Sequence, residues 1–365
     1  MMTFFKNKFT IVLVCICLFI IIFELNDVWV ENYYYGFFYP IISNIQRFIF
    51  GWIPFSLGDV VYLIFILSII VLLMLFCRNL FRTENKKSFL QKSVVKIIHA
   101  IMILFIVFKL LWGLNYSRQG ITQQLHFTLN ETNTKTIESF IEQLYFDANN
   151  YRKQITDTNL PAISFKQVVD ETKKSYSTIS VQYPFLKVNH FALKPNLYSG
   201  LGNYFGYTGY YNPITGEAQV RTDIPQILTP AIACHEVAHQ LGYASEDEAN
   251  FIAYLLCSHS NNIYFKYAIT LELIDYAYKK LMILYLKENN IKNYRFNKFM
   301  LDDCASILVK KDRRKIKDFF IKNRKDLSDI SSAMYDGYLK MNKEKEGVNS
   351  YSNVVDLVLS FEKGR

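Results

Sequence analysis

The sequence predicts a mainly α-helical protein, in which three membrane-spanning helices precede a helix-rich α+β domain with a small β-sheet or hairpin. Three observations lead to this prediction. Residues 1–114 contain three long apolar stretches. Most of residues 115–365 follow helical patterns, and one segment rich in Gly and Tyr interrupts them. Directly after that segment, two histidines lie four residues apart on a predicted helix, with a glutamate beside the first.

Each of the three apolar stretches has the length that a membrane crossing needs. They cover roughly residues 9–27, 59–77 and 97–114, and a helix needs about 20 residues to cross a hydrocarbon core of ~30 Å. No small-residue cleavage site follows the first stretch, and two more spans come after it, so we expect an uncleaved anchor rather than a signal peptide. The sequence therefore predicts a membrane anchor over residues 1–114 and a second domain over residues 115–365.

Basic residues predict how the anchor is oriented. Lys6 and Lys8 precede the first span, and six Lys and Arg residues lie between the second and third spans, from Arg78 to Lys96. Between the first and second spans Arg47 is the only basic residue. Cytoplasmic loops carry the excess of Lys and Arg, so the N-terminus is expected in the cytoplasm. After three crossings residues 115–365 lie outside, which predicts a multi-pass cell-membrane protein with an extracytoplasmic domain.

The stretch between the first and second spans is rich in aromatic residues from Trp29 to Phe55. This composition is typical of a segment that lies at the membrane interface. A small core buried between the spans would have the same composition, so both interpretations stay open.

The net charge of +9 does not indicate a nucleic-acid partner. Ten of the 41 Lys and Arg residues and five of the 32 Asp and Glu residues precede Asn115, which leaves 31 against 27 in the second domain. The excess is therefore mainly a signal of membrane orientation. The basic cluster Lys310–Lys315 is expected to be a solvated helix face, with attraction to anionic lipid or cell-wall polymer as the alternative.

Between about Val188 and Thr222 the pattern changes from helices to strands and turns. Asn212-Pro213-Ile214-Thr215-Gly216 is a turn signal that separates Tyr204–Tyr211 from Glu217–Thr222. This predicts a β-hairpin directly before the histidine-bearing helix. Other helices are predicted at Thr134–Lys153, Phe165–Ser177, Tyr264–Glu288 and Ser352–Phe361.

The histidine-bearing helix, here called the motif helix, is predicted over Pro230–Leu241. Thr229 is a suitable N-cap, Pro230 suits the first turn, and Gly242 is a natural terminator. This helix carries the pattern His235-Glu236-Val237-Ala238-His239.

Positions i and i+4 share one face of a helix, so His235 and His239 are expected to bind one metal ion. Glu236 is then placed to accept a proton from water activated at that ion. Two histidines on a helix with an intervening glutamate are the ligand pattern of zinc hydrolases, which use one further protein ligand and leave the fourth position open. We therefore expect one Zn²⁺ and a catalytic role for Glu236.

A third ligand is expected from the next helix, predicted from Glu246 to about Ser260. Its helical geometry places Glu246 and Ala249 on one face, whereas Glu248 points about 160° away from that face. We expect Glu246 as the third ligand and keep Glu248 as the alternative. Asn250, one turn after Glu246, is a candidate for a group that orients a ligand.

The stretch from His235 to Asn250 resembles the gluzincin type of metallopeptidase, in which a Glu-x-x-Ala-Asn or Glu-x-x-Ala-Asp sequence supplies the third ligand. Glu246, Ala249 and Asn250 match that register, although many relatives have Asp where this chain has Asn250. The resemblance implies a zincin-like fold with His235, His239 and Glu246 as zinc ligands. It also implies that a strand before the motif helix, here Ala218–Thr222, pairs with an extended substrate.

A longer pattern resembles a narrower family, the bacterial membrane proteins called domain of unknown function 3810. It comprises His235–Gly242, the following Glu246–Phe251 and the closing Asn349–Val355. The membrane spans ahead of the motif fit the same family.

The function expected from these features is a membrane-anchored zinc-dependent metallopeptidase that hydrolyses peptide bonds outside the cytoplasm. The residues themselves indicate hydrolysis, and the preference for a peptide or protein substrate comes from the resemblance. An envelope protein or a cell-wall peptide would be such a substrate, and a cell-wall peptide amidase with the same site is one alternative. A catalytically silent zinc scaffold is another, which Glu236 argues against because a structural site does not need that carboxylate. With 26 tyrosines in the chain, the sequence singles out none as the group that stabilises the transition state.

Overall fold

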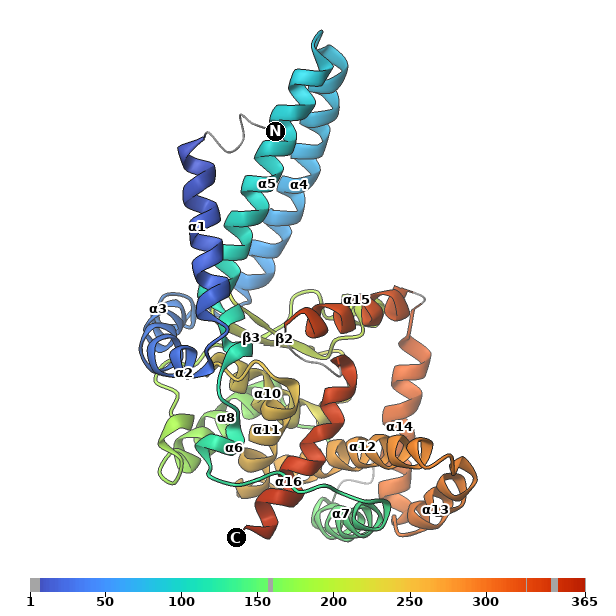
Figure 1. Ribbon diagram of the computed structural model, residues 1–365. Helices are drawn as coiled ribbons and strands as arrows, with labels where there is room; N and C mark the ends of the chain where they lie inside the picture. The colour runs from blue at the N-terminus through green and yellow to red at the C-terminus, as the bar shows by residue number, and fades with distance from the viewer. Residues whose placement is uncertain (1–6, 157–159, 326, 343–346, 365) are drawn as a thin grey trace.

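The computed structural model of the chain describes residues 7–156, 160–325, 327–342 and 347–364, so Lys6 of the orientation argument lies outside the described residues. Three helices, α1 (Lys8–Phe23), α4 (Leu57–Arg82) and α5 (Lys86–Leu111), rise side by side from a larger helical body (Figure 1). The architecture is mainly helical with one small mixed sheet, as predicted.

Helices α4 and α5 are each long and apolar enough to cross a membrane, whereas α1 meets that test only together with the helical segment Asp27–Phe50, from which it is bent by 100°. The described residues thus contain two candidate spans, or three if the bent pair counts as one. The predicted loop Arg78–Lys96 is wrong, because α4 and α5 continue through it and break only at residues 83–85. No helix breaker lies in that stretch, and the Asn85 side chain accepts a hydrogen bond from the Ser88 backbone to start α5.

Charged and polar groups on α1 and α5 are paired with each other. Glu24, directly after α1, lies 2.6 Å from the Lys109 ammonium of α5. Near the other end of α1, the Thr10 hydroxyl lies 2.8 Å from Nε2 of His99. Ionisable groups within apolar helices are costly unless paired, so these contacts fix how the two helices meet.

The aromatic stretch after α1 is helical. Helix α2 (Asp27–Trp29) continues into the π-helix η1 (Val30–Phe38) and then α3 (Tyr39–Phe50). The interpretation as a buried core is confirmed in part, because Tyr34 and Tyr39 are buried, whereas Phe48 is exposed. One side of the stretch thus joins the protein core, and the other faces outward. The interpretation as a segment at the membrane interface stays a prediction.

The sheet has the strand order β1-β3-β2, with β1 (Leu193–Pro195) parallel and β2 (Gly209–Asn212) antiparallel to β3 (Glu217–Val220). Strands β2 and β3 form the predicted hairpin, and Gly216 in its turn has a φ of +69° that favours glycine. The strand expected to pair with substrate, Ala218–Thr222, corresponds to β3. That prediction is wrong, because β1 and β2 already occupy both edges of β3.

The remaining helices enclose the sheet and the motif helix. The predicted helices are all present, with bounds shifted by a few residues. The long ones are α7 (Thr134–Gln154), α8 (Phe165–Ile179), α10 (Thr229–Gln240), α11 (Glu246–His259), α12 (Ile263–Lys287), α13 (Ile291–Asp303), α14 (Ile307–Asn323), α15 (Leu327–Met341) and α16 (Val354–Lys363). The short ones are η2 (Gly113–Ser117), α6 (Ile121–Gln124), η3 (Pro184–Leu186), η4 (Ser199–Leu201), α9 (Gly202–Phe205), η5 (Gln226–Leu228) and η6 (Gly347–Asn353).

The base of α4 is tied to the sheet. The Glu217 carboxylate on β3 accepts a hydrogen bond of 2.6 Å from the backbone N–H of Gly58, in the first turn of α4. Asp59, one residue further, accepts a hydrogen bond of 2.7 Å from the backbone of Leu197. A carboxylate at a helix N-terminus satisfies free N–H groups and complements the helix dipole. The division of the chain at residue 114 stays a prediction, and residues on both sides of it share these contacts.

Candidate metal centre

The motif helix is α10, and its limits follow from local chemistry. It begins at Thr229, which lies inside the helix and does not cap it, because the 3₁₀ turn η5 leads directly into the first turn. It ends before Gly242, whose φ of +86° is the left-handed conformation expected of a terminator. A Cβ at Gly242 would also lie 2.8 Å from the Tyr39 ring and 2.9 Å from Asn115 Oδ1. The turn that returns the chain to α11 thus requires glycine for two reasons.

The structure brings His235, His239 and Glu246 together. One ligand atom from each lies within 4.8 Å of the others. The Nε2 atoms of the two histidines are 3.1 Å apart. Oε2 of Glu246 lies 3.1 Å from His235 Nε2 and 3.8 Å from His239 Nε2. Three converging donors, two imidazole nitrogens and one carboxylate oxygen, are the chemistry that Zn²⁺ prefers.

Each donor is oriented by a neighbour. Nδ1 of His235 lies 2.8 Å from Asn250 Oδ1, and Nδ1 of His239 lies 2.6 Å from the carbonyl oxygen of Tyr243. Oε1 of Glu246 accepts a hydrogen bond from the Tyr335 hydroxyl. Oε2 of Glu246 is buried and faces the Nε2 atoms of the two histidines. These observations fit a cation at the point where the three side chains converge.

Glu248, the alternative third ligand, lies elsewhere. Its Oε1 accepts a hydrogen bond of 2.5 Å from the backbone N–H of Ile121, at the start of α6. Because this carboxylate is engaged at another helix terminus, the structure brings Glu246 and not Glu248 to the histidines. Asn250 lies where the sequence placed an orienting group.

The three donors perturb one another's protonation. Burial lowers the pKa of His235, but the hydrogen bond and the charge of Glu246, with smaller contributions from Glu236 and Asn250, outweigh it and raise this pKa to about 9. Burial and the neighbouring His235 lower the pKa of His239 to about 4. The pKa of Glu246 falls to about 2, because the histidines outweigh burial. The ionised Glu246 and the neutral His239 have the protonation that metal coordination needs, whereas His235 would release its proton when a cation binds.

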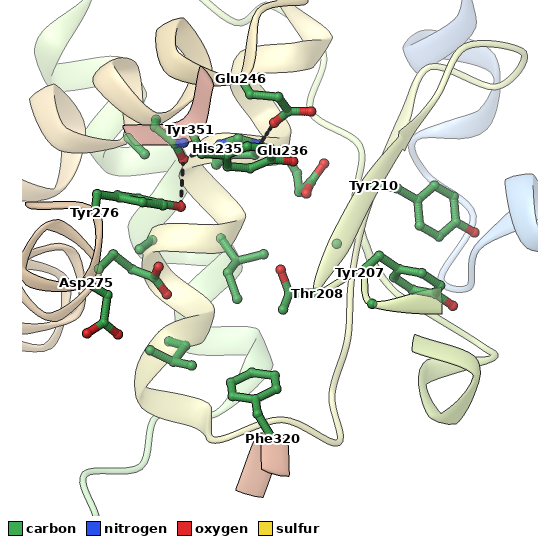
Figure 2. A pocket seen from close by; sticks show the side chains of 18 of the residues that line it. Tyr207, Thr208, Tyr210, His235, Glu236, Glu246, Asp275, Tyr276, Phe320 and Tyr351 are labelled. Carbon is green, nitrogen blue, oxygen red and sulfur yellow. Dashed lines mark hydrogen bonds and ion pairs between the residues drawn. The ribbon is translucent and has the colours of Figure 1, made fainter. Parts of the chain in front are cut away.

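Glu236 faces a large cavity. Figure 2 shows its side chain leaving α10 toward the segment that carries Tyr207, Thr208 and Tyr210. Its Oε2 atom is buried without a hydrogen-bond partner. Burial is the largest cause that raises the pKa of Glu236, to about 8. A carboxyl with such a pKa can gain and lose a proton near neutral pH.

Glycine lets the strand approach this carboxylate. A Cβ at Gly209 of β2 would lie 2.6 Å from Oε1 of Glu236 and 2.8 Å from the carbonyl oxygen of Gln219. Glu236 therefore packs against bare backbone, which fixes its position relative to the strand.

The cavity has a volume of about 1660 Å³ and passes between β2, α10, α12, α14 and α15. The three converging donors His235, His239 and Glu246, here called the metal cluster for the ion they could hold, line it together with Glu236. Tyr62 of α4 and Trp112 at the end of α5 line it as well. Part of the basic cluster, Lys310 and Arg313 among it, also lines this space rather than forming only a solvated face.

Three tyrosines at the metal cluster were not identified from the sequence. Tyr335 donates to Glu246, and the Tyr276 hydroxyl lies 3.4 Å from Asn250 Oδ1 (Figure 2). Tyr351, from η6, lines the cavity near Tyr276 (Figure 2). They come from three different elements after α11, and no spacing in the sequence relates them to the motif. Only folding distinguishes them from the other tyrosines.

The comparison with protein families gives one match. The model of a family described as a protein of unknown function, DUF3810, matches residues 34–359, which is most of the chain. The chain belongs to the DUF3810 family. The family region begins at Tyr34, so α3, α4 and α5 belong to it together with the metal cluster. None of the curated proteins and none of the solved structures that were compared matches the chain.

Proposed function

We propose that this DUF3810 member is a membrane-anchored, zinc-dependent metallopeptidase with a zincin-like catalytic core. The observation that carries the proposal is the convergence of His235, His239 and Glu246 within 4.8 Å, with the unpartnered carboxylate of Glu236 at the adjoining cavity. A structural zinc site is normally closed by four protein ligands. Three ligands facing a cavity, with a free carboxylate nearby, favour catalysis.

In the proposed mechanism His235, His239 and Glu246 would hold Zn²⁺, which when bound supplies Lewis acidity to the scissile carbonyl and to water. Glu236 accepts the proton of the attacking water and then delivers it to the leaving nitrogen. Asn250 and the Tyr243 carbonyl keep the two imidazoles in the tautomer that leaves Nε2 free.

The proposed substrate is an extended polypeptide. The segment Tyr207–Tyr210, which includes the start of β2, lines the cavity directly opposite Glu236. Strand β2 pairs with β3 on one side, and in the described sheet it is the edge strand next to the cavity. An extended peptide can add to such an edge through main-chain hydrogen bonds. In this proposal β2 takes the role that the sequence assigned to the β3 segment.

The proposed location is the cell membrane, with the N-terminus cytoplasmic and the catalytic domain outside. Its support is the length and apolarity of α4 and α5 together with the excess of Lys and Arg on the predicted cytoplasmic side. The turn between α4 and α5 then lies on the cytoplasmic side, and α10, which carries the two histidines, lies near the opposite ends of these helices (Figure 1).

The test uses the full-length protein in detergent, loaded with zinc, and the variant Glu236→Gln. Casein and peptidoglycan are offered as substrates, products are identified by mass spectrometry, and bound zinc is measured by elemental analysis. We expect the wild type to cleave peptide bonds and Glu236→Gln to keep zinc but lose at least 10²-fold in rate. The exposed α7 glutamate provides the matched control, Glu142→Gln, which should behave as the wild type.

The outcomes separate the alternatives. Cleavage of peptidoglycan stem peptides alone would favour the amidase. A zinc-loaded wild type that cleaves neither substrate would favour the scaffold, and a protein that binds no zinc would end the proposal.

A further inference from the structure

Helix α3 has its polarity reversed relative to an ordinary surface helix. Its exposed face consists of large apolar side chains: Ile41 is 47% exposed, Ile45 52%, Phe48 67% and Ile49 48%. These positions follow the i, i+4, i+7, i+8 spacing of one helical face. A soluble protein normally buries such a face against its own core.

The opposite face of α3 is polar and buried. It contains Ser43, Gln46 and Arg47, which are between 1% and 8% exposed. Gln46 donates hydrogen bonds of 2.8 and 2.9 Å to the carbonyl oxygens of Pro213 and Ile214, in the hairpin turn. The polar face is therefore committed to the protein, and rotating the helix to hide its apolar face would break these bonds.

The buried face of α3 holds the end of the motif helix. Arg47 donates a hydrogen bond of 2.7 Å to the carbonyl oxygen of Gln240, and Ser43 donates one of 3.0 Å to the same oxygen. The Tyr39 hydroxyl lies 3.2 Å from the carbonyl oxygen of His239. The last carbonyls of a helix lack partners within the helix, and a cation there complements the helix dipole. Helix α3 thus supplies the C-terminal cap of the helix that carries the metal ligands.

The direction of α3 indicates what covers its apolar face. The segment that contains α3 is bent by 100° from α1. In Figure 1, α3 lies at the base of the three projecting helices, across their direction. A helix perpendicular to membrane spans and at their end lies in the plane of the membrane surface. The exposed Trp52, two residues after the end of α3, is of a residue type that favours the membrane interface.

We propose that α3 lies in the surface of a lipid bilayer, with Ile41, Ile45, Phe48 and Ile49 among the acyl chains and the polar face capping α10. The occupant of the apolar face is phospholipid, because α3 packs against the span α5 at the base of the projecting helices, where lipid surrounds the spans. The proposal rests on the membrane location proposed above and goes beyond it: the bilayer contacts the element that caps the metal-bearing helix. In this position the apolar side chains of α3 contact acyl chains, and its polar side chains keep their hydrogen bonds to the protein.

The test is the quenching of tryptophan fluorescence by lipids with brominated acyl chains. Full-length Ile45→Trp is reconstituted in phosphatidylcholine and phosphatidylglycerol vesicles, and the signal of the unsubstituted protein is subtracted. The matched control is Phe296→Trp on α13, which is 65% exposed and lies far from the projecting helices (Figure 1). We expect brominated lipid to quench Ile45→Trp at least threefold more strongly than Phe296→Trp. Ile41→Trp on the same face should repeat the result if Ile45→Trp does not fold.

Equal quenching of the Ile45→Trp and Phe296→Trp variants would overturn the proposal. So would a photoreactive side chain at position 45 that forms adducts with a second copy of the chain instead of lipid. The readout needs no hydrolysis, so a protein without peptidase activity can still satisfy this test. Conversely, an active peptidase with an unquenched α3 would contradict this inference alone.

Discussion

The amide oxygen of Asn250 lies 2.8 Å from Nδ1 of His235. Because that oxygen can only accept a hydrogen bond, Nδ1 is the nitrogen that carries the proton when the His235 ring is neutral, and the lone pair is then on Nε2. Nε2 is the atom that lies 3.1 Å from Glu246 Oε2, at the centre of the proposed zinc site. Asn250 therefore decides which nitrogen of His235 is available to a metal.

Substitution of Asn250 should weaken zinc binding without abolishing the fold. Asn250→Leu loses the acceptor, and we expect zinc affinity to fall by about 10–100-fold. Asn250→Asp keeps an acceptor at the same position and should bind zinc nearly as well as the wild type. Competition with a chromophoric chelator measures both, and an unchanged affinity for Asn250→Leu would refute the orienting role.

Substitution of Gly209 should impair catalysis and leave the metal in place. The new Cβ of Gly209→Ala would lie 2.6 Å from Oε1 of Glu236, so that carboxylate has to move. We expect bound zinc to be unchanged and the rate of hydrolysis to fall on the order of 10²-fold. Gly200→Ala is the control, because a Cβ there meets nothing within 4 Å. Equal rates for the two variants would show that β2 does not fix the position of Glu236.

Removal of the two acidic side chains at the start of α11 should have different effects. Glu246→Ala should lose zinc, as measured by elemental analysis, because it removes one of the three converging donors. Glu248→Ala should keep zinc and lose about 1 kcal/mol of stability, since it leaves the Ile121 backbone N–H without its partner. The reverse pattern would make Glu248 the ligand.

Stability should depend on pH through Glu272, a cavity residue of α12. Burial, and then the charge of Asp275, raise its pKa to about 7. The folded state therefore holds this proton more tightly than the unfolded chain does. The ionisation of Glu272 does not affect the free energy of unfolding below pH ~4.5, lowers it progressively as pH rises toward and through 7, and has its full destabilising effect above that. We expect Glu272→Gln to match the wild type at pH 4.5 and to be more stable at pH 8, by up to about 2 kcal/mol. Thermal unfolding in detergent at both pH values measures the stability of the variant relative to the wild type. If the stability advantage of Glu272→Gln became smaller as pH rises, the raised pKa of Glu272 would be contradicted.

A buried ion pair should contribute strongly to the body of the protein. Arg152 of α7 lies 2.6 Å from Asp312 of α14, and both side chains are at most 1% exposed. Asp312→Ala removes a fully buried carboxylate from beside the buried guanidinium of Arg152, which should cost about 3–5 kcal/mol. Asp303→Ala, whose carboxylate is 63% exposed in its pair with Lys310, should cost less than about 1 kcal/mol. Chemical denaturation compares the two variants.

Local patterns in the sequence predicted much of the site. The limits of α11, the turn at Gly242 and the hairpin before α10 follow from caps, glycines and alternating patterns that act over a few residues. The i, i+4 spacing predicted that His235 and His239 share a face, and helical geometry favoured Glu246 over Glu248. These relative positions are fixed within one helical turn or one loop, so they can be predicted from the sequence alone.

Other features depend on segments that are distant in the sequence. The strand at the cavity is β2 rather than β3, because β1 pairs with β3 in a way that no local pattern signals. Tyr335 reaches Glu246 from 89 residues away. Arg47, which the sequence suggested only as an isolated positive charge, caps the motif helix 193 residues later.

The sequence by itself determined a His-Glu-x-x-His motif on a helix that ends before a glycine, apolar stretches of spanning length and a hairpin ahead of the motif, because periodicity and short-range backbone chemistry fix these. The tertiary structure decided which strand and which tyrosines surround the metal cluster, and that a helix with an outward apolar face holds the end of α10. These features depend on packing and on hydrogen bonds between residues that are distant in the sequence, and local sequence patterns do not predict such contacts.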